Sequence, residues 1–125
     1  MNPHTKTFIA SGAIGHRRLV KFTATDGVVA LATAATDLIA GVTDFPSGAT
    51  DGGRIDVIQL GPAEVVAGGN IGAGASFTAG AAGAAVAAAP AAGVNNVLGG
   101  FTETAAAAGD FVRVFVQRGH IQGAA

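Results

Sequence analysis

Residues 38–44, LIAGVTD, recur 59 positions later as residues 97–103, VLGGFTE. Three other segments recur in the same order: residues 14–15 at 71–72, residues 21–24 at 76–79, and residues 56–60 at 112–116. Similar segments that recur in a fixed order at spacings of 55 to 59 residues are typical of a duplicated structural unit. The sequence therefore predicts two repeats, the first at about residues 11–65 and the second at about residues 68–121.

Each repeat has the pattern of short strands separated by tight turns. In the first repeat, Asp26-Gly27 separates two apolar runs, which is typical of a β-hairpin because glycine tolerates a positive φ. Residues 55–60 and 111–116 are rich in Val, Ile and Phe and are the strongest candidates for strands. The second of these is almost continuously apolar, so we expect both of its faces to be buried, at least in part, and Phe115 to belong to the core.

Residues 79–92 set helix propensity against the repeat. Alanine is the best helix former, so composition alone predicts a helix in this segment. Gly80, Gly83 and Pro90 interrupt such a helix, and the segment aligns with the hairpin of the first repeat. We therefore expect extended structure and turns over residues 79–92. A short helical turn is expected at residues 104–108, with Gly109 as its C-terminal cap.

These elements predict a single all-β domain at residues 10–121, with an N-terminal arm at residues 1–9 and a C-terminal tail at residues 122–125. The arm either adds as a strand to the sheet of a neighbouring subunit or forms the first strand of its own domain. The core is expected to be thin, because 29 residues are Ala and 20 are Gly. A thin core favours either oligomerisation or adhesion to something larger, since each buries further apolar surface.

Charge and composition exclude several classes of function. Seven Lys and Arg against eight Asp and Glu give a net charge of −1, which argues against binding to nucleic acid or to a membrane surface. The absence of Cys excludes disulfides, thiolate metal sites and thiol catalysis. His4, His16 and His120 lack the spacing of a helical zinc site. We therefore expect no metal, cofactor, catalytic residue or enzyme activity, while an active site assembled between subunits stays open.

The repeated segments resemble those of one protein family. The second repeat has the apolar residues 97–101, the Ala-Ala-Ala-Ala-Gly-Asp turn at 105–110 and a Val-rich final strand. The first repeat has the corresponding residues 38–42 and 47–57. This order is similar to the small capsid decoration, or cement, proteins of tailed bacteriophages, the family described as domain of unknown function 2190.

The resemblance implies a fold, a role and partners. The fold is expected to be a small β-barrel or β-clip-like domain. The role is that of a structural virion protein that is made in the host bacterial cytoplasm, binds the outer surface of an icosahedral head and stabilises the expanded shell. The expected partners are the major capsid protein and further copies of the chain itself in a homotrimer.

Eight residues are candidates for contact with the capsid: Asn2, Pro3, His4, Thr5, Lys6, Phe8, Arg17 and Arg18. The first six lie in the arm, and the last two form the only basic doublet, which suits a local salt contact with a partner protein. Two other functions stay open: a tail or head-completion protein of a phage, and a β-rich binding or carrier module. A carrier needs a modifiable lysine at a hairpin tip between the halves, and the only lysines are Lys6 and Lys21.

Overall fold

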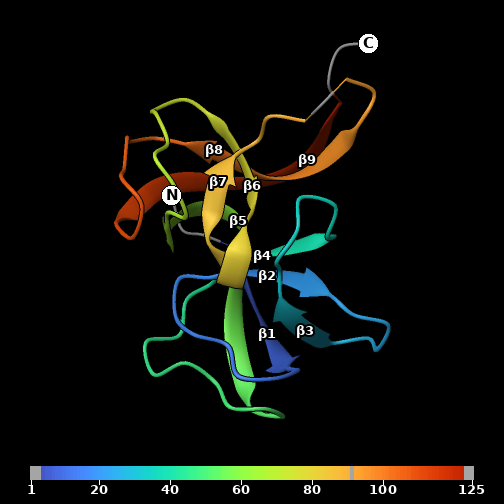
Figure 1. The fold of residues 1–125 in the computed structure, drawn as a ribbon. Helices are drawn as coiled ribbons and strands as arrows, with labels where there is room; N and C mark the ends of the chain where they lie inside the picture. Colours follow the sequence, from blue (N-terminus) through green and yellow to red (C-terminus); the bar gives the residue numbers. More distant parts are fainter. Residues whose placement is uncertain (1–3, 91, 123–125) are drawn as a thin grey trace.

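The computed structural model describes residues 4–90 and 92–122. Over these residues the chain forms nine β-strands and one short 3₁₀ helix, so the predicted all-β class is confirmed (Figure 1). In chain order the elements are β1 (His4–Ala10), β2 (Leu19–Phe22), β3 (Val28–Leu31), β4 (Ile39–Thr43), β5 (Arg54–Val66), β6 (Ser76–Ala79), η1 (Ala81–Gly83), β7 (Ala85–Ala87), β8 (Asn95–Thr102) and β9 (Phe111–Gln122).

The first five strands form a closed barrel. Their order is β1-β3-β2-β4-β5, and β5 pairs with β1 to complete the ring. All of these pairs are antiparallel except β1–β3, which is parallel. The interior is filled by Phe8, Ala10, Ile14, Val20, Val29, Ala40, Ile55 and Val57. We call residues 4–60 the N-terminal unit.

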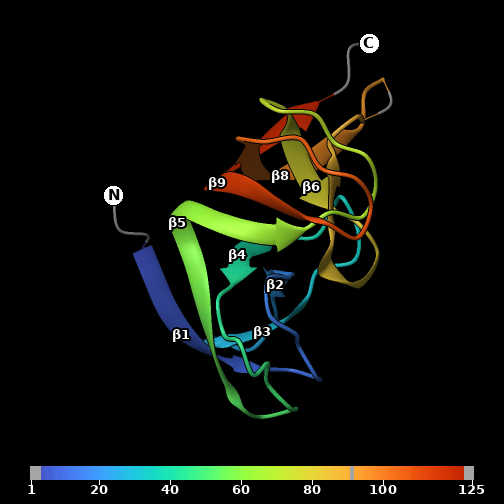
Figure 2. The same cartoon turned by 90° about the vertical axis from the view of Figure 1, so that its left-hand side faces the viewer.

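Strand β5 belongs to both halves of the molecule. Its first part pairs with β1 and β4, and its second part, from Gly61 onward, pairs with β9. The strand bends sharply between the two parts, and Gly61 has a φ of +111° (Figure 2). The second half has the strand order β5-β9-β8-β6-β7, and a parallel bridge between Ala67 and Ala85 joins it back to the end of β5. We call residues 61–122 the C-terminal unit.

The internal repeat extends to single hydrogen bonds. Thr43 Oγ1 donates to the carbonyl of Gly15, and Thr102 Oγ1 donates to the carbonyl of Gly72. Each hydroxyl also accepts a backbone N–H from the loop before the second strand of its unit. Both threonines are buried, so each bond satisfies a polar group that water cannot reach. The two units are therefore copies of one structural design.

The structure corrects the register of one pair of repeated segments. Residues 76–79 were expected to match residues 21–24, but β6 occupies the same place in its unit as β2, residues 19–22. The letters Phe-Thr-Ala, common to both segments, give the wrong alignment. Phe77 lies in the interior with no exposed surface, whereas Phe22 is 40% exposed at the end of the barrel.

The final strands of the two repeats are also shifted, by one residue. Val42 pairs with Ile58, and Phe101 pairs with Phe115, so Ile58 and Phe115 correspond. A shift of one residue exchanges the two faces of a strand. Phe115 therefore points outward and is half-buried, and its assignment to the core is wrong. One face of residues 111–116 is buried, at Val112, Val114 and Val116. The partial burial expected of the other face is found only at Phe115, since Phe111 and Arg113 are exposed.

Two glycines allow the strands of each unit to approach closely. A Cβ at Gly41 would overlap the carbonyl oxygen of Ile58, and a Cβ at Gly100 would overlap the carbonyl oxygen of Phe115. Both glycines lie next to an irregularity in strand pairing, where a side chain has no room. The glycine that repeats in the two sequence segments is therefore required by the barrel geometry.

The alanine-rich segments contain little helix. The described residues between 79 and 92 are extended apart from the single turn of η1, as predicted, and Ala91 lies outside the described residues. The helical turn expected at residues 104–108 is wrong. Ala106 instead forms an antiparallel bridge with Ile71, as Ala49 does with Ile14 in the N-terminal unit. The same β-bridge thus forms in both units, although four successive alanines favour a helix in the second.

The segments expected as an arm and a tail contain paired residues. Residues 4–9 pair with residues 54–60 of β5, so this part of the arm is the first strand of its own domain. Gln122 pairs with Asn95 and belongs to β9 rather than to a tail. Residues 1–3 and 123–125 lie outside the described residues.

Candidate functional site

The candidate residues of the arm differ in exposure along β1. His4, Thr5 and Lys6 are exposed. Phe8 is only 4% exposed, and its ring packs edge-on against Phe22 with 6.3 Å between the ring centroids. Phe8 therefore holds β1 in the barrel and does not face outward. Asn2 and Pro3 lie outside the described residues.

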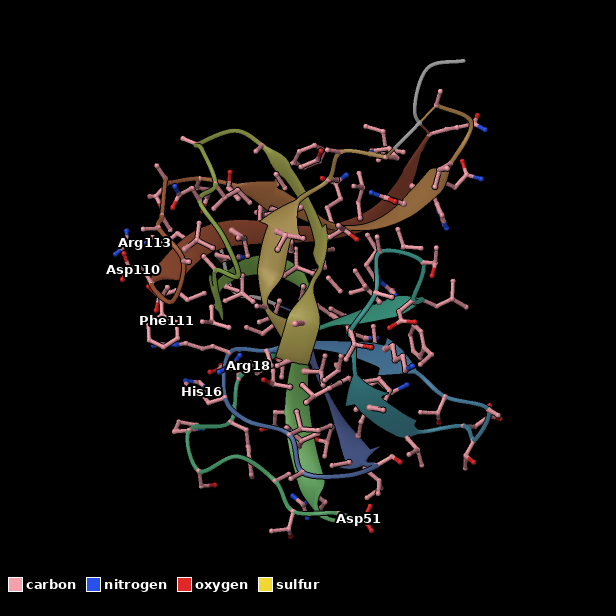
Figure 3. All side chains as sticks on the ribbon, in the orientation of Figure 1. His16, Arg18, Asp51, Asp110, Phe111 and Arg113 are labelled. Carbon is pink, nitrogen blue, oxygen red and sulfur yellow. The ribbon has the colours of Figure 1, made fainter. Side chains whose placement is uncertain are left out.

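The basic doublet lies on the loop between β1 and β2, where the N-terminal unit meets the C-terminal unit. Arg17 Nη2 lies 3.0 Å from Glu64 Oε1, and the guanidinium of Arg17 lies 4.5 Å from the centre of the Phe111 ring. Arg18 Nη1 donates to the carbonyl of Ala82 at 3.3 Å. Figure 3 shows Arg18 on this loop, on the same side of the molecule as Phe111. Both arginines thus make contacts between the two units of the chain.

The backbone of Arg17 has an unusual conformation for a residue with a side chain. Its φ is +59°, and the N–H of Arg17 donates to the carbonyl of Thr43. At the same place in the C-terminal unit, Gly74 has a φ of +75° and donates to Thr102. A non-glycine residue in this conformation costs about 1 kcal/mol or more. The repeat therefore favours glycine here, and the contacts of the Arg17 side chain offset the backbone strain.

A groove of about 420 Å³ opens beside Arg17 at the junction of the units. It is lined by Arg17, Thr43, Asp44, Ile58, Pro62, Ala63, Glu64, Glu103 and Arg113. Arg113 Nε lies 3.8 Å from Glu64 Oε2, so the Glu64 carboxylate lies between two guanidinium groups. The groove thus combines charges of both signs with the apolar side chains of Ile58 and Pro62.

Two carboxylates of the groove are repeat equivalents. The backbone N–H of Asp44 donates to the carbonyl of Asp56, and that of Glu103 donates to the carbonyl of Arg113. Asp44 and Glu103 end the repeated segments 38–44 and 97–103, and these matching bonds give them the same turn geometry. Their common position follows from the duplication, so it is not by itself a sign of acid–base chemistry.

A second groove, of about 340 Å³, is mostly apolar. It is lined by Phe22, Leu38, Ile39, Val97, Arg118, Gly119 and His120. The guanidinium of Arg118 lies 5.5 Å from the centre of the Phe22 ring, which covers part of that exposed aromatic side chain. Leu38 remains 60% exposed. This groove also lies between the two units, since its residues come from both.

The described residues contain few features of a chemical site. Among residues 4–90 and 92–122, no group of three His, Asp or Glu side chains is placed to hold a metal ion. In the same part of the chain, no helix has the length and apolar character needed to cross a membrane. Mixed-charge and apolar surface at the junction of two rigid units suits contact with another macromolecule.

Sequence reasoning did not find Glu64, Phe111 or Arg113 as members of the junction. Each is distant from Arg17 in sequence, and only the fold brings them together. The repeat contains one indication of this role. Arg17 and Gly74 occupy equivalent positions, so an arginine stands where the other repeat has a glycine, which suggests that the Arg17 side chain makes contacts.

The sequence matches no protein-family model, and it matches no curated protein. The fold has a counterpart among solved structures, the N base of the head fiber gp8.5 of bacteriophage phi29. The two structures superpose with a TM-score of 0.66 at 20% sequence identity, over 93% of this chain and 95% of that one. This likeness shows the fold. The resemblance to the decoration-protein family stays a prediction.

Proposed function

We propose that this protein is a structural protein of a phage head that binds the outer surface of the icosahedral shell and stabilises it after expansion. The observation that carries the proposal is the likeness over 93% of the chain to the base of a phage head fiber. The same role is the one that the resemblance of the repeated segments to capsid decoration proteins predicts. The proposed partners are the major capsid protein and further copies of the chain, as a homotrimer.

The physical properties of the molecule agree with an adhesive role. The two units share one continuous strand and contact each other through the Arg17–Glu64 salt bridge and backbone hydrogen bonds, which makes a rigid body. A protein that binds the expanded shell and not its precursor shifts the equilibrium toward the expanded form. Many copies on one shell add their weak contacts to a large total stabilisation.

The proposed capsid contacts are the exposed end of β1 and the loop that precedes β2. His4, Thr5 and Lys6 present polar side chains at the start of β1. Arg17 and Arg18 retain partial exposure while they join the two units. Asn2 and Pro3 complete the proposed set in the sequence.

Co-sedimentation with purified heads tests the proposal. Expanded, undecorated heads of the phage that encodes the protein are mixed with increasing protein and pelleted, and unexpanded procapsids serve as the control. Saturable binding at a fixed ratio to the shell protein, absent from procapsids, is expected. Absence of binding to expanded heads at micromolar protein refutes the proposed function.

The phi29 protein is the base of a fiber, which favours a second candidate, a platform that attaches to the head without strengthening it. A thermal stability assay of the heads separates the two functions. Shell stabilisation raises the temperature at which decorated heads release their DNA, whereas a platform leaves this temperature unchanged while still binding.

A further inference from the structure

The outer face of the N-terminal unit is covered within the chain. Val42 has no exposed surface and Ile58 is 5% exposed, although both point out of the barrel. Both belong to the same hydrophobic cluster as interior residues of the C-terminal unit, such as Phe77, and not to the cluster inside their own barrel. The C-terminal unit therefore shields this apolar face from water.

Within residues 4–90 and 92–122, no second unit covers the equivalent face of the C-terminal unit. Phe101 and Phe115 occupy the places of Val42 and Ile58, because the strand pairing of the two units is the same. Phe101 is 44% exposed, and Phe115 is half-buried. The duplication has replaced two aliphatic residues by two larger aromatic ones on a face that lacks a partner. Exposed aromatic side chains of this kind are typical of protein interfaces.

The hairpin tips of the two units differ in the same way, since one is covered and the other is open. In the C-terminal unit, the hairpin between β6 and β7 has Gly83 at its tip, where a Cβ would lie 2.8 Å from the carbonyl oxygen of Leu19. The tip is thus pressed against the outer face of the N-terminal unit. In the N-terminal unit, Gly27 takes the same place with a φ of +77°, and nothing lies within 4 Å of its Cβ position. This hairpin tip is open.

We infer that the face around Phe101 and Phe115 binds a second copy of this chain, against the side of its N-terminal unit that carries the hairpin tip at Asp26 and Gly27. The contact repeats between molecules the one that already joins the two units within the molecule. In the described part of the chain, each of the two complementary surfaces has one copy without a partner, so the occupant that we propose for the face is a second copy of this chain.

The resulting association is head to tail. One surface of each copy meets a different surface of the next copy, and such a contact forms a ring if its rotation closes. The inference deepens the trimer of the proposed function and rests on it, since three copies then form one ring of six similar units. The thin core predicted from the composition agrees, because the ring buries apolar surface that a single chain leaves in water.

Sedimentation velocity of variants at three phenylalanines tests the proposed face around Phe101 and Phe115. Phe101→Ala and Phe115→Ala truncate the proposed interface, and Phe111→Ala is the control, since Phe111 is 52% exposed on β9 but lies beside Arg17. We expect the wild type and Phe111→Ala to sediment as a closed oligomer. The double variant Phe101→Ala/Phe115→Ala is expected to raise the dissociation constant at least tenfold, while circular dichroism shows that its strands are retained.

Cysteine cross-linking tests the face and the hairpin tip together. It remains informative if the double alanine variant fails to fold. Within the chain, Arg18 lies beside the hairpin tip and bonds Ala82. Their repeat equivalents are Ala75 and Asp26, and the natural chain has no Cys. On mild oxidation, the double variant Ala75→Cys/Asp26→Cys is expected to give covalent dimers and trimers on a denaturing gel, whereas either single variant gives no trimer.

The outcomes separate the inference from the proposed function. A wild type that stays monomeric at high micromolar concentration overturns the inference, and so does an oligomer that is unaffected by the double alanine variant and forms no cross-linked ladder. In either case, binding of the wild type to expanded heads still supports the head-binding role. Failure of head binding by an oligomer with the predicted cross-links refutes that role and leaves the interface in place.

Discussion

Arg17 offers a way to measure backbone strain and side-chain contacts separately. Arg17→Ala keeps a side chain at a φ of +59° and removes the contacts to Glu64 and Phe111. An exposed ion pair contributes about 0.2–1 kcal/mol, and an exposed cation–π contact contributes about 0.5–1 kcal/mol. The expected loss in free energy of unfolding is therefore about 1 kcal/mol.

Arg17→Gly removes the same contacts but also relieves the strain. Glycine adopts the left-handed conformation without steric cost, which returns about 1 kcal/mol relative to alanine. The stability of Arg17→Gly is therefore expected to be close to that of the wild type. Gly74→Ala is the matched control, since it introduces strain at the equivalent position, where nothing lies within 4 Å of the new Cβ. It is expected to lose about 1 kcal/mol.

Urea denaturation followed by circular dichroism measures all three variants, provided that the slope of the transition stays constant. Two results refute the reasoning. Equal stability of Arg17→Ala and Arg17→Gly means that the backbone at this position is not strained. A wild-type midpoint for Arg17→Ala means that the side chain does not hold the units together.

Three further variants test the core and the repeat by the same measurement. Phe77→Ala is expected to lose about 3–5 kcal/mol because the ring has no exposed surface; a loss no greater than that of Phe115→Ala contradicts this assignment. Gly100→Ala is expected to unfold the C-terminal unit or to shift its strands, because the new Cβ meets the backbone of Phe115. Gly72→Ala, which has open space around its Cβ, is the control and is expected to stay within about 1 kcal/mol of the wild type. Thr102→Val removes two part-buried hydrogen bonds, to the carbonyl of Gly72 and from the N–H of Ala75, so a loss of about 1–3 kcal/mol is expected, and an unchanged midpoint means that water replaces the hydroxyl.

The repeat made much of the fold predictable from the sequence. Gly41 and Gly100 recur because each permits a close backbone approach, and this steric requirement preserves a recognisable segment. The repeat also gave the correct prediction of extended structure and turns for residues 79–92, where helix propensity alone predicts a helix. Strand register was less predictable. Identical letters at residues 22–24 and 77–79 belong to different places in the fold, because Phe22 and Phe77 fill space in different ways.

The candidate site was less predictable than the fold. A local pattern identified Arg17 and Arg18, but their partners come from β5, β9 and the η1 turn. The polar and apolar residues of the arm alternate, and this alternation suits a strand that closes its own barrel as well as one that is added to a neighbouring subunit. The sequence therefore does not show that residues 4–9 pair within the chain. Only the pairing with β5 and the burial of Phe8 distinguish the two.

The thirteen residues of β5 run through both units without a linker. A force that separates the units therefore acts on one continuous strand, which is bent at Gly61 and held by hydrogen bonds to β1 on one side and to β9 on the other. Those hydrogen bonds must break before this part of the chain can extend, whereas a flexible tether would extend at once. In the proposed function, outward pressure on a shell would thus be resisted by a paired strand between the two units rather than taken up by a linker.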